Sequence, residues 1–305
     1  MVKIILSIAG GGIKGKIAAK LVDLIEQEMN QDVTEIFDLF VGTSIGSILC
    51  GAYASGLYSA KFVNEQLFVK ENYTKMMSPD SHLNTIFGTI GLLPKYGSNG
   101  KIEMLNKYFK ENRMNTVEKY LMIPAYNVSK DKPKFFKSWS SHEDLLLSSI
   151  INASSAAPGY FSPEQIGPDI YADGGIGCNY PEDCAYTEGI RLWGIKEDIR
   201  ILVLDLGKTN KNIQPKKWWG LAEWITAGDL SGLVFDGNRE ESGYVLKNLA
   251  ESLGHKYLIL DGQLKNNSLD DISDQNVENL EKTAQYLWEK HKPQIMSLLK
   301  KSTSL

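Results

Sequence analysis

A serine between two glycines is the residue of this sequence best suited to nucleophilic chemistry. In the motif Gly42-Thr43-Ser44-Ile45-Gly46, the two glycines would relieve crowding at a sharp turn between a strand and a helix. Such a turn exposes the serine Oγ above the sheet, with the positive N-terminus of the helix behind it. The motif therefore predicts a nucleophile elbow centred on Ser44.

A glycine-rich loop, Gly10-Gly11-Gly12-Ile13-Lys14-Gly15, follows a short apolar stretch and precedes a helical one. The backbone N–H groups of such a loop bind negative charge at the positive end of a helix dipole. Beside a serine nucleophile, the loop would supply an oxyanion hole. Taken alone, it also fits the dinucleotide fingerprint G-x-G-x-x-G, with Glu35 or Asp38 as its acidic residue, so a nucleotide-binding module is the alternative.

A serine nucleophile needs a base, and the sequence offers two kinds. Asp173 ends a short apolar stretch, and Gly174 and Gly175 after it would let the backbone approach closely, although an ordinary Asp-Gly turn has the same sequence. His255 precedes a strand near the C-terminus and fits the order Ser, Asp, His of α/β-hydrolases. For each histidine a surface or capping role is the simpler interpretation; the four are His82, His142, His255 and His291.

These motifs resemble the patatin-like phospholipases. Four segments match in the family's order: residues 10–15, 42–46, 153–161 (Ala-Ser-Ser-Ala-Ala-Pro-Gly-Tyr-Phe) and 173–175. The resemblance implies a Ser-Asp dyad that hydrolyses acyl esters of phospholipids and other lipids without a histidine. It assigns Ser44 as nucleophile, Asp173 as base and the amides of Gly10, Gly11 and Gly12 as oxyanion hole. The supporting motif positions are Lys14, Gly15, Gly42, Gly46, Gly174 and Gly175.

Two positions depart from the family pattern. Ala9 stands where plant members often have Asp, and Lys14 stands where an Arg often precedes the last glycine of the loop. Lysine keeps the positive charge but lacks the bidentate fork of arginine, so a phosphate contact there would be less directional. Neither change removes a residue of the dyad.

The composition is that of an ordinary globular protein, with 305 residues, 43% of them apolar and 23% charged. A formal charge of -4 argues against a nucleic-acid partner. No His, Cys, Asp and Glu cluster has metal-ligand spacing, so we expect no metal and no cofactor. The three cysteines form no C-x-x-C pair and are too few for a disulfide framework, which indicates a reducing, cytoplasmic location.

Neither a signal peptide nor a transmembrane helix is expected. The apolar start of the chain meets Gly10 too early to form the core of a signal peptide. Residues 41–60 carry no charge, but they are rich in Gly, Ser and Thr, which favours a helix buried against a sheet.

The positioning elements are read from apolar periodicity. Strands are expected at residues 3–9, 40–41, 121–128, 134–139, 170–172, 199–206 and 257–260. Helices are expected at residues 16–29, 44–57, 142–153 (with Ser140 or Ser141 as N-cap) and 276–299, with two further helical stretches after residue 206. This alternation implies an α/β fold, a mostly parallel central sheet with helices on both faces, as in the three-layer patatin-like architecture. We expect a catalytic domain at 1–210 and a C-terminal extension at 211–305 packed on it.

Two segments are candidates for lipid contact. Residues 72–100 lack a clear period, which suits a long functional loop or lid, and within them residues 76–96 carry apolar side chains that suit an acyl-chain lid. Residues 208–224 mix lysines with Trp218, Trp219 and Trp224, which suits a headgroup layer, although tryptophans at helical spacing also pack into cores. The expected partners are a phospholipid or other lipid ester and a peripheral membrane surface, and an activating ligand or protein is left open.

The sequence therefore predicts a lipid acyl hydrolase of the phospholipase A or lysophospholipase type that works through an acyl-enzyme. An esterase or thioesterase with another acyl substrate is the alternative within the same chemistry. The nucleotide-binding module remains the alternative from a different class.

Overall fold

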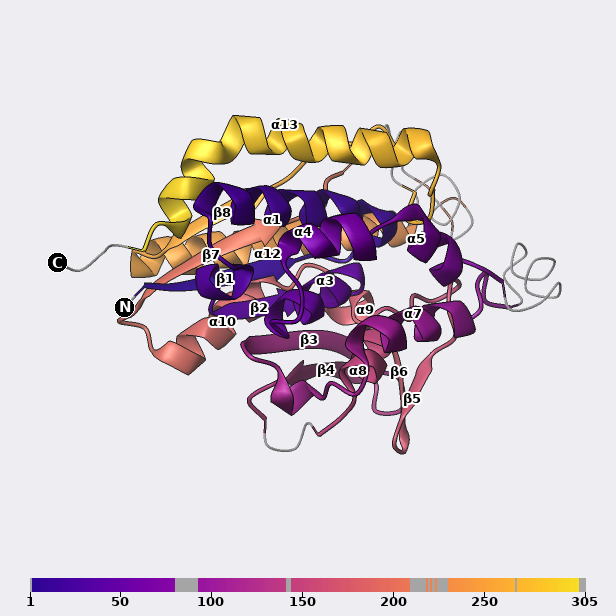
Figure 1. The fold of residues 1–305 in the computed structure, drawn as a ribbon. Helices are drawn as coiled ribbons and strands as arrows, with labels where there is room; N and C mark the ends of the chain where they lie inside the picture. Colours follow the sequence, from indigo (N-terminus) through magenta and orange to yellow (C-terminus); the bar gives the residue numbers. More distant parts are fainter. Residues whose placement is uncertain are drawn as a thin grey trace.

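A computed structural model of the chain describes residues 2–79, 93–140, 144–208, 218, 220, 223, 230–266 and 268–301. Within these residues, eight strands form one mixed sheet with helices packed on both of its faces (Figure 1). The order along the sheet is β5-β6-β3-β2-β1-β7-β8, and β4 pairs with β3 outside this path. The expected three-layer α/β architecture is confirmed.

The centre of the sheet is parallel, as the apolar runs predicted. The strands β8, β7, β1, β2 and β3 run in one direction, and β4, β5 and β6 pair antiparallel. Their bounds are β1 Val2–Ile8, β2 Leu39–Gly42, β3 Tyr120–Asn127, β4 Lys132–Lys137, β5 Glu164–Ile166, β6 Asp169–Asp173, β7 Asp198–Leu204 and β8 Lys256–Leu260.

Both faces of the sheet are apolar because alternate side chains of a strand point to opposite faces. In β1, Ile4, Leu6 and Ile8 belong to one buried cluster, whereas Ile5 belongs to a second. The first cluster is covered by helices α1 (Gly15–Met29), α3 (Ile45–Ala54), α8 (Leu147–Ser154) and α13 (Asp274–Leu299), and the second by α10 (Glu182–Trp193) and α12 (Leu230–Leu253). The shorter described helices are α2 Val33–Ile36, α4 Ala60–Phe62, α5 Lys70–Met76, α7 Asn99–Phe109 and α9 Gly175–Cys178, and a π-helical turn spans Val63–Leu67.

One edge of β3 is shared by two strands that approach from opposite directions. The parallel strand β2 pairs with residues 120–122 of β3, and the antiparallel strand β6 pairs with residues 125–127. The other edge of β3 is occupied by β4. The carboxyl ends of β2 and β6 therefore face each other beside Ile123 and Pro124, which brings Gly42 close to Asp173.

Most predicted strands and the helices expected at 16–29, 44–57 and 276–299 are confirmed within a few residues, but the helix expected at 142–153 is not. Helix α8 begins only at Leu147, and Leu146 at its N-cap makes no side-chain cap. The residues before it are held by another segment, since Met114 N donates to Leu145 O and Leu147 N donates to Asn112 O. These tertiary hydrogen bonds make the helix begin later than its sequence suggests, and Ser140 stays outside it.

The stretch expected to be an aperiodic loop is partly helical. Helices α5 and α7 occupy its two ends, while residues 80–92 lie outside the described part. Gly100 inside α7 obscured the helical pattern. It is required there because a Cβ at this position would lie 2.0 Å from Lys75 O of α5. Helix α10 was not predicted, and the domain boundary expected at residue 210 lies outside the described residues.

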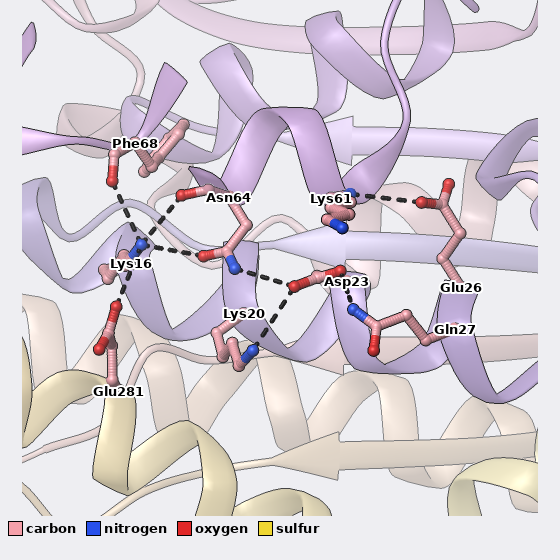
Figure 2. Close-up of polar contacts among 9 residues, drawn as sticks. All are labelled: Lys16, Lys20, Asp23, Glu26, Gln27, Lys61, Asn64, Phe68 and Glu281. Atoms are coloured by element: carbon pink, nitrogen blue, oxygen red, sulfur yellow. Dashed lines mark hydrogen bonds and ion pairs between the residues drawn. The ribbon is translucent and has the colours of Figure 1, made fainter. Parts of the chain in front are cut away.

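A buried lysine fixes the helix that follows the glycine loop. In Figure 2, Lys16 of α1 donates from Nζ to Asn64 O at 2.9 Å, Asn64 Oδ1 at 2.9 Å and Phe68 O at 3.3 Å. Its Nζ also lies 3.3 Å from Glu281 Oε1 of α13, and Asn64 in turn donates to the buried Asp23 at 2.9 Å. The start of α1 is thereby tied to two other parts of the chain.

We predict that Lys16→Met lowers the free energy of unfolding by about 2–4 kcal/mol, because buried carbonyl acceptors lose their donor. Urea denaturation measures this change. The matched control is Lys70→Met, since Lys70 also contacts α13, through Asp274, but both side chains are exposed. That variant should change the stability by less than about 1 kcal/mol. Equal effects of the two substitutions would contradict the role of Lys16.

Candidate active site

Ser44 occupies a strained turn between β2 and α3. Its φ of 55° and ψ of -119° lie outside the conformations that non-glycine residues usually adopt. The turn is possible because its flanking glycines touch backbone: a Cβ on Gly42 would lie 2.1 Å from Gly46 O, and one on Gly46 would lie 2.3 Å from Ile8 O. The local geometry is that of the expected elbow.

The side chain of Ser44 meets the carboxylate of Asp173. Ser44 Oγ donates to Asp173 Oδ2 at 2.7 Å, and the amide of Gly175 donates to Asp173 Oδ1 at 2.7 Å. Asp173 is buried, with 5% of its surface exposed. Two residues that are 129 positions apart in the chain therefore share one hydrogen bond, as the sequence motifs suggested.

The side chain of Ser154, at the end of α8, joins the elbow to the sheet. Ser154 Oγ accepts from the amide of Ser44 at 3.1 Å and donates to Pro124 O at 2.6 Å. Ser154 is fully buried. Ser154 belongs to the motif of residues 153–161, and its side chain links the residue after β2 to β3, beside the end of β6.

The backbone of the same segment holds the carboxylate strand. The amide of Asp173 donates to Ala156 O at 3.0 Å, and the amide of Gly174 donates to Ser154 O at 3.1 Å. The turn that ends α8 thus contacts both sides of the Ser44–Asp173 pair. This geometry explains why residues 153–161 form a recognisable motif although none of them carries the proposed chemistry.

Burial changes the acidity of Asp173. Removal from water raises the pKa of Asp173 from its ordinary value of 3.8 to about 6, against the opposing hydrogen bonds from Gly175 and Ser44 and the charge of Lys101. A carboxylate with a pKa near 6 is a stronger base than one in water and is still largely ionised at neutral pH.

The glycine loop lies beside Ser44, but its three amides are not equivalent. The amide of Gly10 donates to Asn179 O at 3.0 Å, so it is not available as an oxyanion donor in this structure. Among the described residues, the amides of Gly11 and Gly12 have no acceptor. Gly12 has a φ of 58°, and a Cβ there would lie 2.1 Å from Leu269 O. In this structure the amides of Gly11 and Gly12, rather than that of Gly10, are therefore the candidate oxyanion donors.

The remaining motif positions surround this centre. Lys14 is buried and lines the same cavity as Ser44, while Gly15 begins α1 directly behind the loop. Gly174 and Gly175 lead from β6 into the short helix α9. All the site residues proposed from the sequence thus lie at one end of the sheet.

A cavity of about 550 Å³ opens onto Ser44 and Asp173. Its volume is within the range typical of small-molecule sites. Much of its wall is apolar; these side chains are Ile45, Ile48, Met76, Met77, Pro158, Phe161 and Ile176. Tyr96 also lines the cavity and donates to Asp270 Oδ2 at 2.6 Å, so the segment after residue 92 is joined to the loop before α13. The cavity suits an apolar chain attached to a polar group.

The two described histidines do not reach this cavity. His255 lies beside Tyr186, with Nδ1 2.6 Å from the phenol oxygen, and His291 belongs to α13. His82 and His142 lie outside the described residues. The dinucleotide interpretation also loses support. Asp38 precedes β2 and accepts from the amide of Ile4, near the start of β1, whereas the glycine loop follows the end of β1, so the two lie at opposite ends of that strand.

Comparison with known proteins identifies the family. The family model described as patatin-like phospholipase matches residues 6–186. The chain belongs to the patatin-like phospholipase family. A cGAMP-activated phospholipase from Escherichia coli (strain TW11681) is 28% identical over 310 aligned residues, which cover 90% of this chain and 86% of the relative. Patatin-like protein 2 from Oryza sativa subsp. indica is 24% identical over 94% of this chain and 84% of its own length.

The fold is also shared with a solved bacterial protein. The crystal structure of VipD from Legionella pneumophila matches with a TM-score of 0.52 and 14% sequence identity, covering 95% of this chain and 67% of VipD. At this identity the likeness concerns the fold alone. Family membership supports a hydrolase that acts on lipid esters.

The two lipid-contact candidates are only partly described. In the segment 76–96, Met76, Met77 and Tyr96 line the cavity, and residues 80–92 lie outside the described part. In the segment 208–224, Trp218 is 83% exposed, which excludes core packing for this residue, and most of the others lie outside the described part. No described helix is both long and apolar enough to cross a membrane, and no metal-binding group of His, Cys, Asp or Glu occurs among the described residues.

The raised pKa of Asp173 predicts that its ionised form destabilises the fold. The folded protein binds the Asp173 proton more tightly than the unfolded chain does, so the protonated carboxyl stabilises the fold. This stabilisation is complete below about pH 4 and is lost as the pH rises through about 6. At pH 7.5 the free energy of unfolding of Asp173→Asn, measured by urea denaturation, should therefore exceed that of wild type by up to about 3 kcal/mol. The difference should shrink at pH 5. Asp144→Asn, at an exposed carboxylate, should show no such gain, and a destabilised Asp173→Asn protein would contradict the assignment.

Proposed function

We propose that the protein is a lipid acyl hydrolase of the phospholipase A or lysophospholipase type that uses Ser44 and Asp173 as a catalytic dyad. The observation that carries this proposal is the 2.7 Å hydrogen bond from Ser44 Oγ to a buried carboxylate at the wall of an apolar cavity. Family membership supports the same reaction class.

In the proposed reaction, Asp173 accepts the proton of Ser44 while Oγ attacks the acyl carbonyl carbon. The amides of Gly11 and Gly12 stabilise the oxyanion that forms, a contribution of about 3–4 kcal/mol per donor in other hydrolases. Asp173 then passes the proton to the departing alcohol, which leaves an acyl-enzyme on Ser44. Water, activated by Asp173, attacks the acyl-enzyme and releases the fatty acid.

The cavity supports a substrate with a long acyl chain. Ile48, Met77 and Phe161 contribute apolar surface near the dyad, and burial of a chain against such surface contributes about 0.8 kcal/mol per methylene. An esterase or thioesterase acting on another acyl compound would use the same geometry. The headgroup therefore has to be determined by product analysis.

We predict that Ser44→Ala and Asp173→Asn each reduce fatty-acid release at least about a thousandfold, because each removes a group that acts in the transition state. His255→Ala is the matched control and should retain full activity, since His255 lies beside Tyr186 rather than in the cavity. The assay incubates each variant with mixed phospholipid vesicles and identifies fatty acids and lysolipids by mass spectrometry.

The outcomes separate the alternatives. Full turnover by either dyad variant would refute the dyad. Turnover of short esters or thioesters without release from phospholipids would favour the non-phospholipid alternative. Tight dinucleotide binding without any ester turnover would favour the nucleotide-binding module.

We further propose that a ligand activates the enzyme. The aligned relative from Escherichia coli is named for activation by cGAMP, and the alignment covers most of both chains. In the present structure the hydrogen bond from Tyr96 to Asp270 joins two segments of the cavity wall, and a movement that separates these segments to widen the cavity would have to break it. Addition of cGAMP is predicted to raise fatty-acid release from vesicles at least about tenfold, which corresponds to an activation free energy lower by about 1.4 kcal/mol. An enzyme that is equally active with and without the nucleotide would refute activation by this ligand.

A further inference from the structure

Lys101 is a buried cation beside the dyad that the proposed reaction does not use. It lies on α7, has no exposed surface, and lines the cavity together with Ser44 and Asp173. Among the described residues, no carboxylate lies within ion-pair distance of its ammonium group. A fully buried lysine without such a partner is costly, so its contacts need an explanation.

The contacts of Lys101 are at the C-terminal end of α8. Its Nζ donates to Ser155 O at 2.9 Å, Ser155 Oγ at 3.3 Å and Asn152 O at 3.4 Å, and it lies 4.2 Å from the centre of the Phe161 ring. The carbonyl groups at this end of a helix carry the negative end of the dipole. Lys101 therefore caps α8 with a positive charge, and the aromatic ring adds a cation–π contact.

The capped turn is the one that holds the base. The carbonyl oxygen of Ala156 accepts from the amide of Asp173, and that of Ser154 accepts from the amide of Gly174. Lys101 occupies neighbouring carbonyl groups of the same turn. Its position therefore affects Asp173 both through the backbone and through the electric field.

We propose that Lys101 is a positioning residue for the dyad: its ammonium group fixes the turn after α8 and favours the ionised carboxylate of Asp173. The inference rests on the proposed function. Lys101 would support the proposed reaction through the turn and through its charge, without touching a reacting atom.

The charged groups around Lys101 determine how it titrates. Asp173 on β6 and Glu164 on β5 favour the charged lysine, whereas α8 carries no charged residue and Lys75 of α5 is paired with Glu103 on the exposed side. Burial is the largest influence and lowers the pKa of Lys101 to about 7. With Asp173 at about 6, both groups are charged in a narrow range near neutral pH, and their titrations are linked.

The test measures the reactivity of Ser44 itself, so it does not depend on which lipid is cleaved. A fluorophosphonate probe forms an Oγ–P bond to Ser44 and expels fluoride, while the serine proton passes to Asp173. In wild type, the labelling rate should rise with pH through a midpoint near 6. In Lys101→Met, we expect this midpoint to move up by roughly one pH unit, because the ionised carboxylate loses a nearby positive charge. Labelling at pH 6 should fall roughly fivefold as a result.

Two variants serve as controls. Lys75→Met removes an exposed lysine near the same helix and should give a profile that overlays wild type. Lys101→Arg keeps the charge in a larger side chain, so its midpoint should stay near that of wild type even if the overall rate falls. A loss of packing alone would change the rate of both Lys101 variants without moving the midpoint of either.

The result that overturns the proposal is a folded Lys101→Met protein with the wild-type midpoint. If Lys101→Met does not fold, Glu164→Gln decides, because loss of this carboxylate weakens the charged form of Lys101 and should move the midpoint upward by a smaller amount. An unmoved midpoint in Glu164→Gln would then overturn the proposal. Failure of the dyad assignment is distinguishable, since Ser44 would then remain unlabelled in wild type at every pH.

Discussion

The chemistry of this fold depends on two strands that end head to head against one edge of β3. Because β2 runs parallel to β3 and β6 runs antiparallel to it, their carboxyl ends converge on the same short stretch. Pro124 lies in that stretch and has no N–H to offer a further strand. Its carbonyl oxygen instead accepts from Ser154, which also holds the amide of Ser44. The contact between Ser44 and Asp173 follows from this interruption of the sheet.

The same arrangement makes the site costly for the fold. Asp173 is buried and has a raised pKa, Lys101 is buried and has a lowered pKa, and Ser44 has a strained backbone. Each of these features opposes folding, and strained or electrostatically perturbed groups of this kind gather at functional sites. The surrounding apolar clusters and the buried Lys16 network stabilise the elements that hold them.

Local signals were sufficient to predict most of the sheet and the Ser44–Asp173 pair. The glycines around Ser44 and after Asp173 are visible in the sequence, and glycines at such positions indicate close backbone contacts. Lys101 could not be found in this way, because a single lysine after Gly100 looks like a solvent-exposed residue. Its burial results from the packing of α7 on α5 and α8, and that packing involves segments far apart in the chain. The hydrogen bond from the Gly10 amide to Asn179 O could not be predicted for a related reason, since only the tertiary fold brings these two residues together.

The C-terminal third completes the site even though the family model ends at residue 186. Leu269 O accepts from the amide of Ile13 at 2.9 Å and lies against Gly12, so a distant loop fixes the amides proposed to form the oxyanion hole. Glu281 of α13 contacts Lys16 just behind that loop, and Asp270 contacts Tyr96 at the cavity wall. A change in the region before α13 would therefore reach the glycine loop and the cavity wall together. These contacts all come from residues 269–281, so one segment of the C-terminal third joins the glycine loop to the cavity wall.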